Sequence, residues 1–228
     1  MDLQHNMLIS IITTILITLC LEIFIIYRFK SQEVLAMKMW QLFLAGIALS
    51  IAILFLQKLI NPIILNGKGE NSSLIYSSFI TSSLLEETGK IVALLIFLAL
   101  TTTRYELKSL LLYTFSLAWG FCFFENLRYG FTYELGTLMR FKMATPMHII
   151  ATLFAALFIF KYTNASGRKR DLWALLIFLV PILVHGFYNL LLQMPNPTPL
   201  NFGFTFAAME VIILYIVFFF IYKKEEEK

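Results

Sequence analysis

The sequence predicts an all-α fold, a single bundle of about seven transmembrane helices. Three observations support this fold class. Hydrophobic residues make up 59% of the 228-residue chain, and charged residues only 14%, against about 25% in soluble proteins. The mean hydropathy is +0.79. The apolar residues also fall into runs of about 20, which is the length a helix needs to cross the hydrocarbon core of a bilayer.

Seven apolar stretches are separated by short connections that carry Gly, Pro, Asn and charge. The expected spans are residues 7–27, 40–60, 74–100, 107–128, 145–162, 172–193 and 202–222. A surface helix is expected around residues 132–141, in the longest connection. No stretch is polar enough for a separate soluble domain, so residues 1–228 are interpreted as one membrane domain. Residues 74–193 form the core that carries its motifs.

The lysines and arginines near the ends of the spans predict the orientation. With the N-terminus outside and the C-terminus inside, twelve of them lie in inner connections and five in outer ones, as the positive-inside rule requires. The first stretch lacks a small-residue cleavage site and is expected to stay in the protein. The chain is therefore expected in the cell membrane, in contact with lipid and not with nucleic acid, as a multi-pass protein of bacterial type.

Several charged or polar residues lie inside stretches that lipid should surround. The set comprises Glu86, Glu87, Lys90, Glu125, Asn126, His148, His185 and Asn189. An ionisable group at the centre of a bilayer costs roughly 2.5–3.5 kcal/mol on insertion scales. Since these residues belong to four different spans, we expect them to gather at one internal site. Carboxylates and histidines together are suited to activating a water molecule.

Glu86 and Glu87 are adjacent, so on a helix their side chains point about 100° apart. Lys90 is four residues after Glu86 and three after Glu87, and it can pair with either of them. We expect one carboxylate to be held by Lys90 and the other to face a cavity as a general base. The alternative is a buried ion pair that only fixes helix packing.

Glu125 and His148 each allow a functional and a structural interpretation. Glu125, which shares a helix face with Phe121, could hold the attacking water, bind a metal or orient a histidine. It could instead pair with Arg128 at the membrane surface. His148 lies near the start of the fifth span and could complete the site or be an interfacial residue.

His185 and Asn189 lie one turn apart on the sixth span, and both side chains can donate hydrogen bonds. Such donors suit an oxyanion hole, in which they meet the charge that develops on a carbonyl oxygen. A hydrogen bond between helices is the alternative. Glu210, within the last span, either pairs with Lys90 or lines the cavity, and the sequence does not decide between these.

Four motifs together resemble the PrsW family of intramembrane proteases and, more distantly, the CAAX proteases and their bacterial CPBP relatives. The motifs are Glu86-Glu87-x-x-Lys90, Gly120-Phe121-x-x-x-Glu125-Asn126-x-x-Tyr129, His148 and His185-Gly186-x-Tyr188-Asn189. They occur in the family's order and on separate spans. One departure from the wider group is that Glu125 stands where the CAAX proteases carry a histidine.

The resemblance implies a glutamate-dependent endopeptidase that cleaves single-span membrane proteins, such as an anti-sigma factor, on the extracytoplasmic side. In that scheme Glu86, next to Glu87, is the general base that activates water, Glu125 helps to hold the water, and His185 and Asn189 bind the oxyanion. His148 completes the site. Supporting roles fall to Lys90, Asn126, Phe121 and Tyr188.

Three alternatives to a metal-free protease remain open. A zinc protease ranks second, with Glu86, Glu125, His148 and His185 as ligands. It ranks second because the chain has no HExxH motif and no two histidines within one helix turn. A proton-coupled transporter would also bury carboxylates and histidines, although no inverted repeat is visible. A non-catalytic immunity or scaffold protein would keep the fold without the chemistry.

Overall fold

The computed structural model describes residues 3–29, 35–101, 105–132, 140–141 and 143–193, and across these ranges its named elements are all helices. The elements are α1 (Leu3–Phe29), α2 (Ala36–Leu65), α3 (Glu70–Tyr76), the π-helical segment η1 (Ser77–Leu84), α4 (Leu85–Thr101), α5 (Leu107–Thr132), α7 (Ala144–Thr163) and α8 (Arg168–Gln193). This confirms the helical fold class that the sequence predicts.

Five helices in the described part of the chain are long and apolar enough to cross a membrane: α1, α2, α5, α7 and α8. Each coincides within a few residues with an expected span. The seventh expected span, Glu210 within it, and residues 133–139 of the expected surface helix lie outside the described residues. The third expected span, residues 74–100, is described but is not among these five helices, so the total of about seven spans and the orientation stay predictions.

The third apolar stretch differs from the single α-helix expected over residues 74–100. Helical structure begins earlier, at Glu70, and the eight residues Ser77–Leu84 form the π-helical η1 rather than α-helix. Hydroxyl groups contribute to this change, because Ser77 donates to the carbonyl of Leu74 and Thr81 donates to that of Ser77. Such side-chain bonds compete with the regular backbone ladder.

Close contact between α2 and α5 is the tightest packing in the bundle. A Cβ atom on Gly46 would lie 2.1 Å from the carbonyl oxygen of Leu117, and one on Gly120 would lie 1.9 Å from that of Phe43. Small residues permit such an approach of helix backbones in membranes. This contact fixes the position of α5 just ahead of Glu125.

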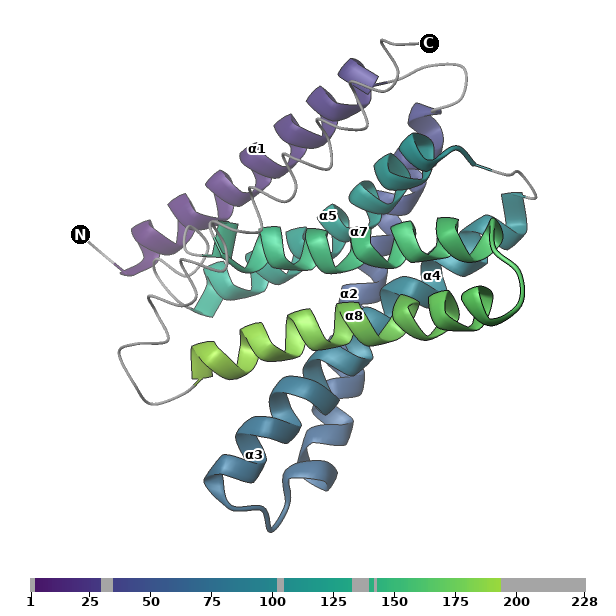
Figure 1. Cartoon of the computed structure of the whole chain (residues 1–228). Coiled ribbons are helices and arrows are strands. Elements are labelled where there is room, and N and C mark those ends of the chain that lie inside the picture. The colour runs from purple at the N-terminus through teal and green to yellow at the C-terminus, as the bar shows by residue number, and fades with distance from the viewer. Residues whose placement is uncertain (1–2, 30–34, 102–104, 133–139, 142, 194–228) are drawn as a thin grey trace.

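The other helices pack around this pair. α1 lies against α5, where Ser116 donates a 2.8 Å hydrogen bond to the buried Glu22 and Trp119 donates to the carbonyl of Thr18. α7 and α8 run side by side, and η1 packs on α8 with Phe79 against Gly186. The hairpin of α2 and α3 extends beyond α8 at one end of the molecule (Figure 1).

Candidate active site

Four helices bring the predicted polar residues together in the interior of the bundle. Glu86, Glu87 and Lys90 lie at the start of α4, immediately after η1. Glu125 comes from α5, and the two histidines, His148 and His185, come from α7 and α8. All of these residues are buried, with Glu87 and Lys90 at 0% exposure. The structure thus places in one cluster residues that are up to 99 positions apart in the chain.

Glu87 is the carboxylate that Lys90 holds. Its Oε1 atom lies 2.6 Å from Lys90 Nζ and 2.7 Å from His185 Nδ1. An ionised carboxylate only accepts hydrogen bonds, so His185 donates from Nδ1 and presents the lone pair of Nε2 on the opposite side of the ring. Glu87 therefore orients His185 and is not free to face the cavity.

Glu86 faces the cavity. Its Oε1 atom accepts hydrogen bonds from Gln57 at 2.9 Å and from Ser82 at 3.0 Å. The other oxygen, Oε2, is buried without a hydrogen-bond partner and lies 3.9 Å from both His148 Nδ1 and His185 Nε2. A buried acceptor without a partner is costly, which points to a ligand or proton at this position.

A carboxylate also fixes the orientation of the His148 ring, as Glu87 does for His185. Its Nε2 atom lies 2.9 Å from Glu125 Oε2, so the ring presents Nδ1 toward Glu86. Lys90 Nζ lies 3.4 Å from this Nδ1 atom. The two imidazole rings are perpendicular, with centroids 4.6 Å apart. Atoms of Glu86, His148 and His185 that could ligate a metal all lie within 4.8 Å of one another.

Glu125 lies behind His148 and not among the three converging atoms. It is shared between His148 and Arg140, whose guanidinium lies 2.6 Å from the same Oε2 atom. Of the four zinc ligands expected from the sequence, the structure thus groups Glu86, His148 and His185, and gives Glu125 an orienting position.

Arg140 is a site residue that the sequence analysis did not single out. Besides Glu125, it donates to Asn126 Oδ1 at 3.0 Å and stacks over the ring of Tyr129 at 4.1 Å. Burial alone would lower the pKa of Arg140, but the carboxylate of Glu125 raises it above its ordinary value, so the guanidinium stays cationic. Arg140 lies in the segment between the spanning helices α5 and α7, outside the apolar stretches whose charged residues marked the cluster.

The supporting residues surround the same centre. Asn126 donates to Thr145 at 3.0 Å, which ties α5 to α7. The ring of Phe121 lies 4.8 Å from Lys90 Nζ. Asn189 lines the cavity and donates to Ser82 at 2.8 Å, whereas Tyr188 packs in a separate apolar cluster.

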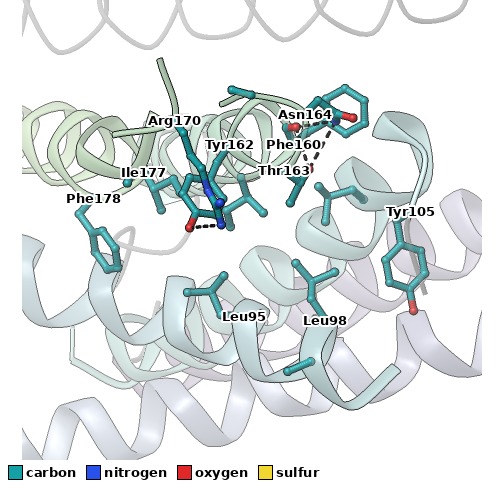
Figure 2. Close-up of a pocket in the computed structure, with 15 residues that line it drawn as sticks. Leu95, Leu98, Tyr105, Phe160, Tyr162, Thr163, Asn164, Arg170, Ile177 and Phe178 are labelled. Carbon is teal, nitrogen blue, oxygen red and sulfur yellow. Dashed lines mark hydrogen bonds between the residues drawn. The ribbon is translucent and has the colours of Figure 1, made fainter. Parts of the chain in front are cut away.

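A polar cavity of about 280 Å³ opens from this centre and is lined by Glu86, Glu125, His148 and His185 among others. A second, larger cavity of about 860 Å³ lies between α4, α7 and α8 (Figure 2). The described residues around that second cavity are mostly apolar and include no carboxylate or histidine. The clustered carboxylates and histidines therefore lie at the smaller cavity.

The region that contains this cluster matches a known protein family. The family model described as PrsW family intramembrane metalloprotease matches residues 34–222, which include every residue of the cluster. The chain belongs to the PrsW family. The resemblance seen in the four sequence motifs is thereby confirmed.

Among curated PrsW proteins, the chain is similar to Protease PrsW of Clostridioides difficile (strain 630). The two are 30% identical over 159 residues, which are 66% of this chain and 65% of that protein. The matched region thus spans slightly less than two thirds of the relative. No solved structure matches the chain. A PrsW-family chain with five helices able to span a membrane, counted within the described residues, fits a multi-pass membrane protein.

Proposed function

We propose that this chain is an endopeptidase that hydrolyses a peptide bond of a membrane-anchored protein, with water as the nucleophile. The observation that carries the proposal is the convergence of Glu86, His148 and His185, each fixed by a partner on its far side. Catalytic groups must be held within a fraction of an ångström to be effective, and this arrangement supplies such support.

The donor set fits zinc. Catalytic zinc sites use three protein ligands, two histidines and a glutamate in several proteases, and leave a fourth position open. Histidines that ligate zinc usually donate their other N–H to a carboxylate, as His148 and His185 do to Glu125 and Glu87. The absence of an HExxH motif and of two histidines within one helix turn made zinc the second choice from sequence; the convergence of Glu86, His148 and His185 from three helices makes it our first.

In this proposal Glu86, His148 and His185 would hold the metal, which when bound would acidify a water molecule and polarise the substrate carbonyl. The remaining residues act around it. Glu87 and Glu125 keep each imidazole in the tautomer that presents its lone pair to the centre. The amide of Asn189, at the cavity wall, is a donor for the carbonyl oxygen that becomes negative in the transition state.

The metal-free version assigns the water-activating role to Glu86 Oε2, whose lone pair is unused. It then requires His185 Nε2 to donate a hydrogen bond to the oxyanion. A neutral His185 that donates from Nδ1 to Glu87 offers only a lone pair at Nε2, so this version needs an imidazolium.

The proposed substrate is a single-span protein such as an anti-sigma factor, cleaved at the extracytoplasmic side of a bacterial cell membrane.

The test combines cleavage with metal content. A panel of tagged single-span proteins would be co-expressed with the wild type, Glu86→Gln or His185→Ala, and the purified proteins would be assayed for bound zinc by mass spectrometry. We expect both variants to lose cleavage and zinc while they still insert and fold. Glu106→Gln, an exposed carboxylate outside the cluster, is the matched control and should behave as wild type.

Each result has a definite meaning. Cleavage that is lost with a chelator and restored by zinc supports the metal version. Cleavage that depends on Glu86 but resists the chelator, in a protein without bound metal, supports the metal-free version. Normal turnover by either variant would contradict both, and a protein that tolerates Glu86→Gln in its cellular role would be a scaffold instead.

A further inference from the structure

Four carboxamide side chains form two pairs on the walls of the polar cavity, one pair on α2 and one on α8. Gln57 and Asn61 lie four residues apart on α2, and Asn189 and Gln193 lie four residues apart on α8. All four line the cavity that contains Glu86. Both helices contact η1, which contributes Ser77, Thr81 and Ser82 to the wall of the same cavity.

These amides are partly unsatisfied. Gln57 and Asn189 use their nitrogens to bind Glu86 and Ser82, and Gln193 accepts from Ser77 through its oxygen. Asn61 Oδ1 is buried without a hydrogen-bond partner. A carboxamide has two donors and an acceptor with two lone pairs, so each of the four retains capacity for an additional partner.

The spacing of each pair matches that of an extended peptide. Four residues of α-helix rise about 6 Å. Two residues of extended chain rise about 6.6 Å, and backbone groups on one edge of a strand repeat with this period. A pair of carboxamides at positions i and i+4 can therefore meet two successive N–H or C=O groups on the same edge of an extended segment.

A substrate inside a membrane needs such partners. In a transmembrane helix every backbone group is bonded within the helix, and the scissile carbonyl is shielded. Unwinding the helix at membrane depth removes these internal partners, at a cost of several kcal/mol for each group left unsatisfied. Polar side chains at the cleavage site would offset this cost.

We propose that the two carboxamide pairs bind the unwound, extended backbone of the substrate, one pair along each edge, and so deliver the adjacent peptide bond to Glu86. This inference rests on the proposed peptidase function and specifies its substrate class. The ligand is a membrane-anchored segment that leaves the helical conformation readily, because the contacts are made to backbone groups rather than to particular side chains.

Binding measurements test this separately from cleavage. The full chain carrying Glu86→Gln, in lipid vesicles, would be titrated with two fluorescent single-span peptides. One has a Gly-Gly-Pro interruption at its outer end, and the other has an uninterrupted polyleucine helix. We expect tighter binding of the interrupted peptide, by about 10-fold if two net hydrogen bonds distinguish the peptides.

Two distal carboxamides are suitable for substitution, because neither contacts Glu86 or the histidines. Asn61→Leu combined with Gln193→Met, in the Glu86→Gln background, should abolish the preference for the interrupted peptide. Gln41→Met, which removes an exposed carboxamide elsewhere on α2, is the matched control and should retain the preference. Circular dichroism and detergent melting would verify that each variant is folded.

The failures of the two proposals are distinguishable. Equal binding of both peptides, or a preference that survives in the double variant, would overturn the carboxamide proposal whatever the protease does. A preference that disappears as expected, in a protein whose wild type cleaves no substrate, would retain the backbone-binding site and reject the peptidase function.

Discussion

At the scale of single residues, each carboxylate behind a histidine is shared between that histidine and a cationic side chain. Glu87 is divided between Lys90 and His185, and Glu125 between Arg140 and His148. Each histidine is therefore left with a single nitrogen toward the centre. Glu86 differs from both carboxylates, because its Oε1 is held only by the neutral side chains of Gln57 and Ser82, and its Oε2, which has no hydrogen-bond partner, lies 3.9 Å from a nitrogen of each histidine.

Loss of Glu87 should destabilise the protein more than loss of the whole ion pair. Glu87→Gln leaves the fully buried Lys90 without its carboxylate, and breaking a buried pair in this way costs about 3–5 kcal/mol. Adding Lys90→Met removes the stranded charge and should recover a large part of this loss. Thermal unfolding in detergent measures both, and equal melting temperatures for the single and double variants would contradict the expectation.

Arg140 is predicted to act through Glu125 and His148. Arg140→Met should leave the protein folded but weaken zinc binding or cleavage by about 10–100-fold, the usual effect of losing a group that orients a metal ligand. Arg170→Met, at the exposed start of α8, is the control and should have no such effect. A variant Arg140→Met with wild-type zinc affinity and turnover would show that Glu125 needs no cation.

The residue types of the site were predictable from the sequence, but their partners were not. Charge inside apolar stretches marks Glu86, Glu125 and His185 as candidates for a functional site, whatever their contacts are. The assignment of Lys90 to Glu87, and not to Glu86, depends on how α4 is rotated against α7 and α8. Nothing in the sequence marked Arg140 as a site residue, because basic residues are common in the connections between spans.

At the scale of elements, the contact of α2 with α5 positions the site without taking part in its chemistry. Gly120→Ala would place a Cβ atom 1.9 Å from the Phe43 carbonyl, so the two helices must separate. We expect a lower melting temperature and reduced cleavage, because α5 also carries Glu125. Gly69→Ala, where the added atom meets nothing within 4 Å, is the control. A Gly120→Ala protein that melts like wild type would contradict this account.

The helices themselves follow closely from hydropathy, since length and apolar composition decide where a chain can cross a bilayer. Hydropathy does not distinguish π-helix from α-helix, so η1 was missed. Its sequence, SSFITSSL, has an unusual number of hydroxyl residues for an apolar stretch, and that was the available signal.

At the scale of the whole molecule, the orientation in the membrane is a testable prediction. The excess of basic residues places the α2–α3 connection outside and the α7–α8 connection inside. A cysteine introduced at Lys68 should react with a membrane-impermeant maleimide in intact cells, whereas one at Lys169 should react only after permeabilisation. Native Cys20 and Cys122 lie within helices. The reverse pattern of labelling would invert the topology and place cleavage on the cytoplasmic side.

The π-helical η1 also affects which mutations the protein can tolerate, because its length sets the rotation of α3 relative to α4. An α-helical residue turns the chain by about 100°, so removing one residue from η1 would rotate α3 against α4 by roughly that angle. Ser77 and Thr81, on the cavity wall, would then turn away from it while Glu86 kept its place. Substitutions within η1 should therefore be tolerated more readily than a single-codon deletion, and related chains should conserve its length before its sequence.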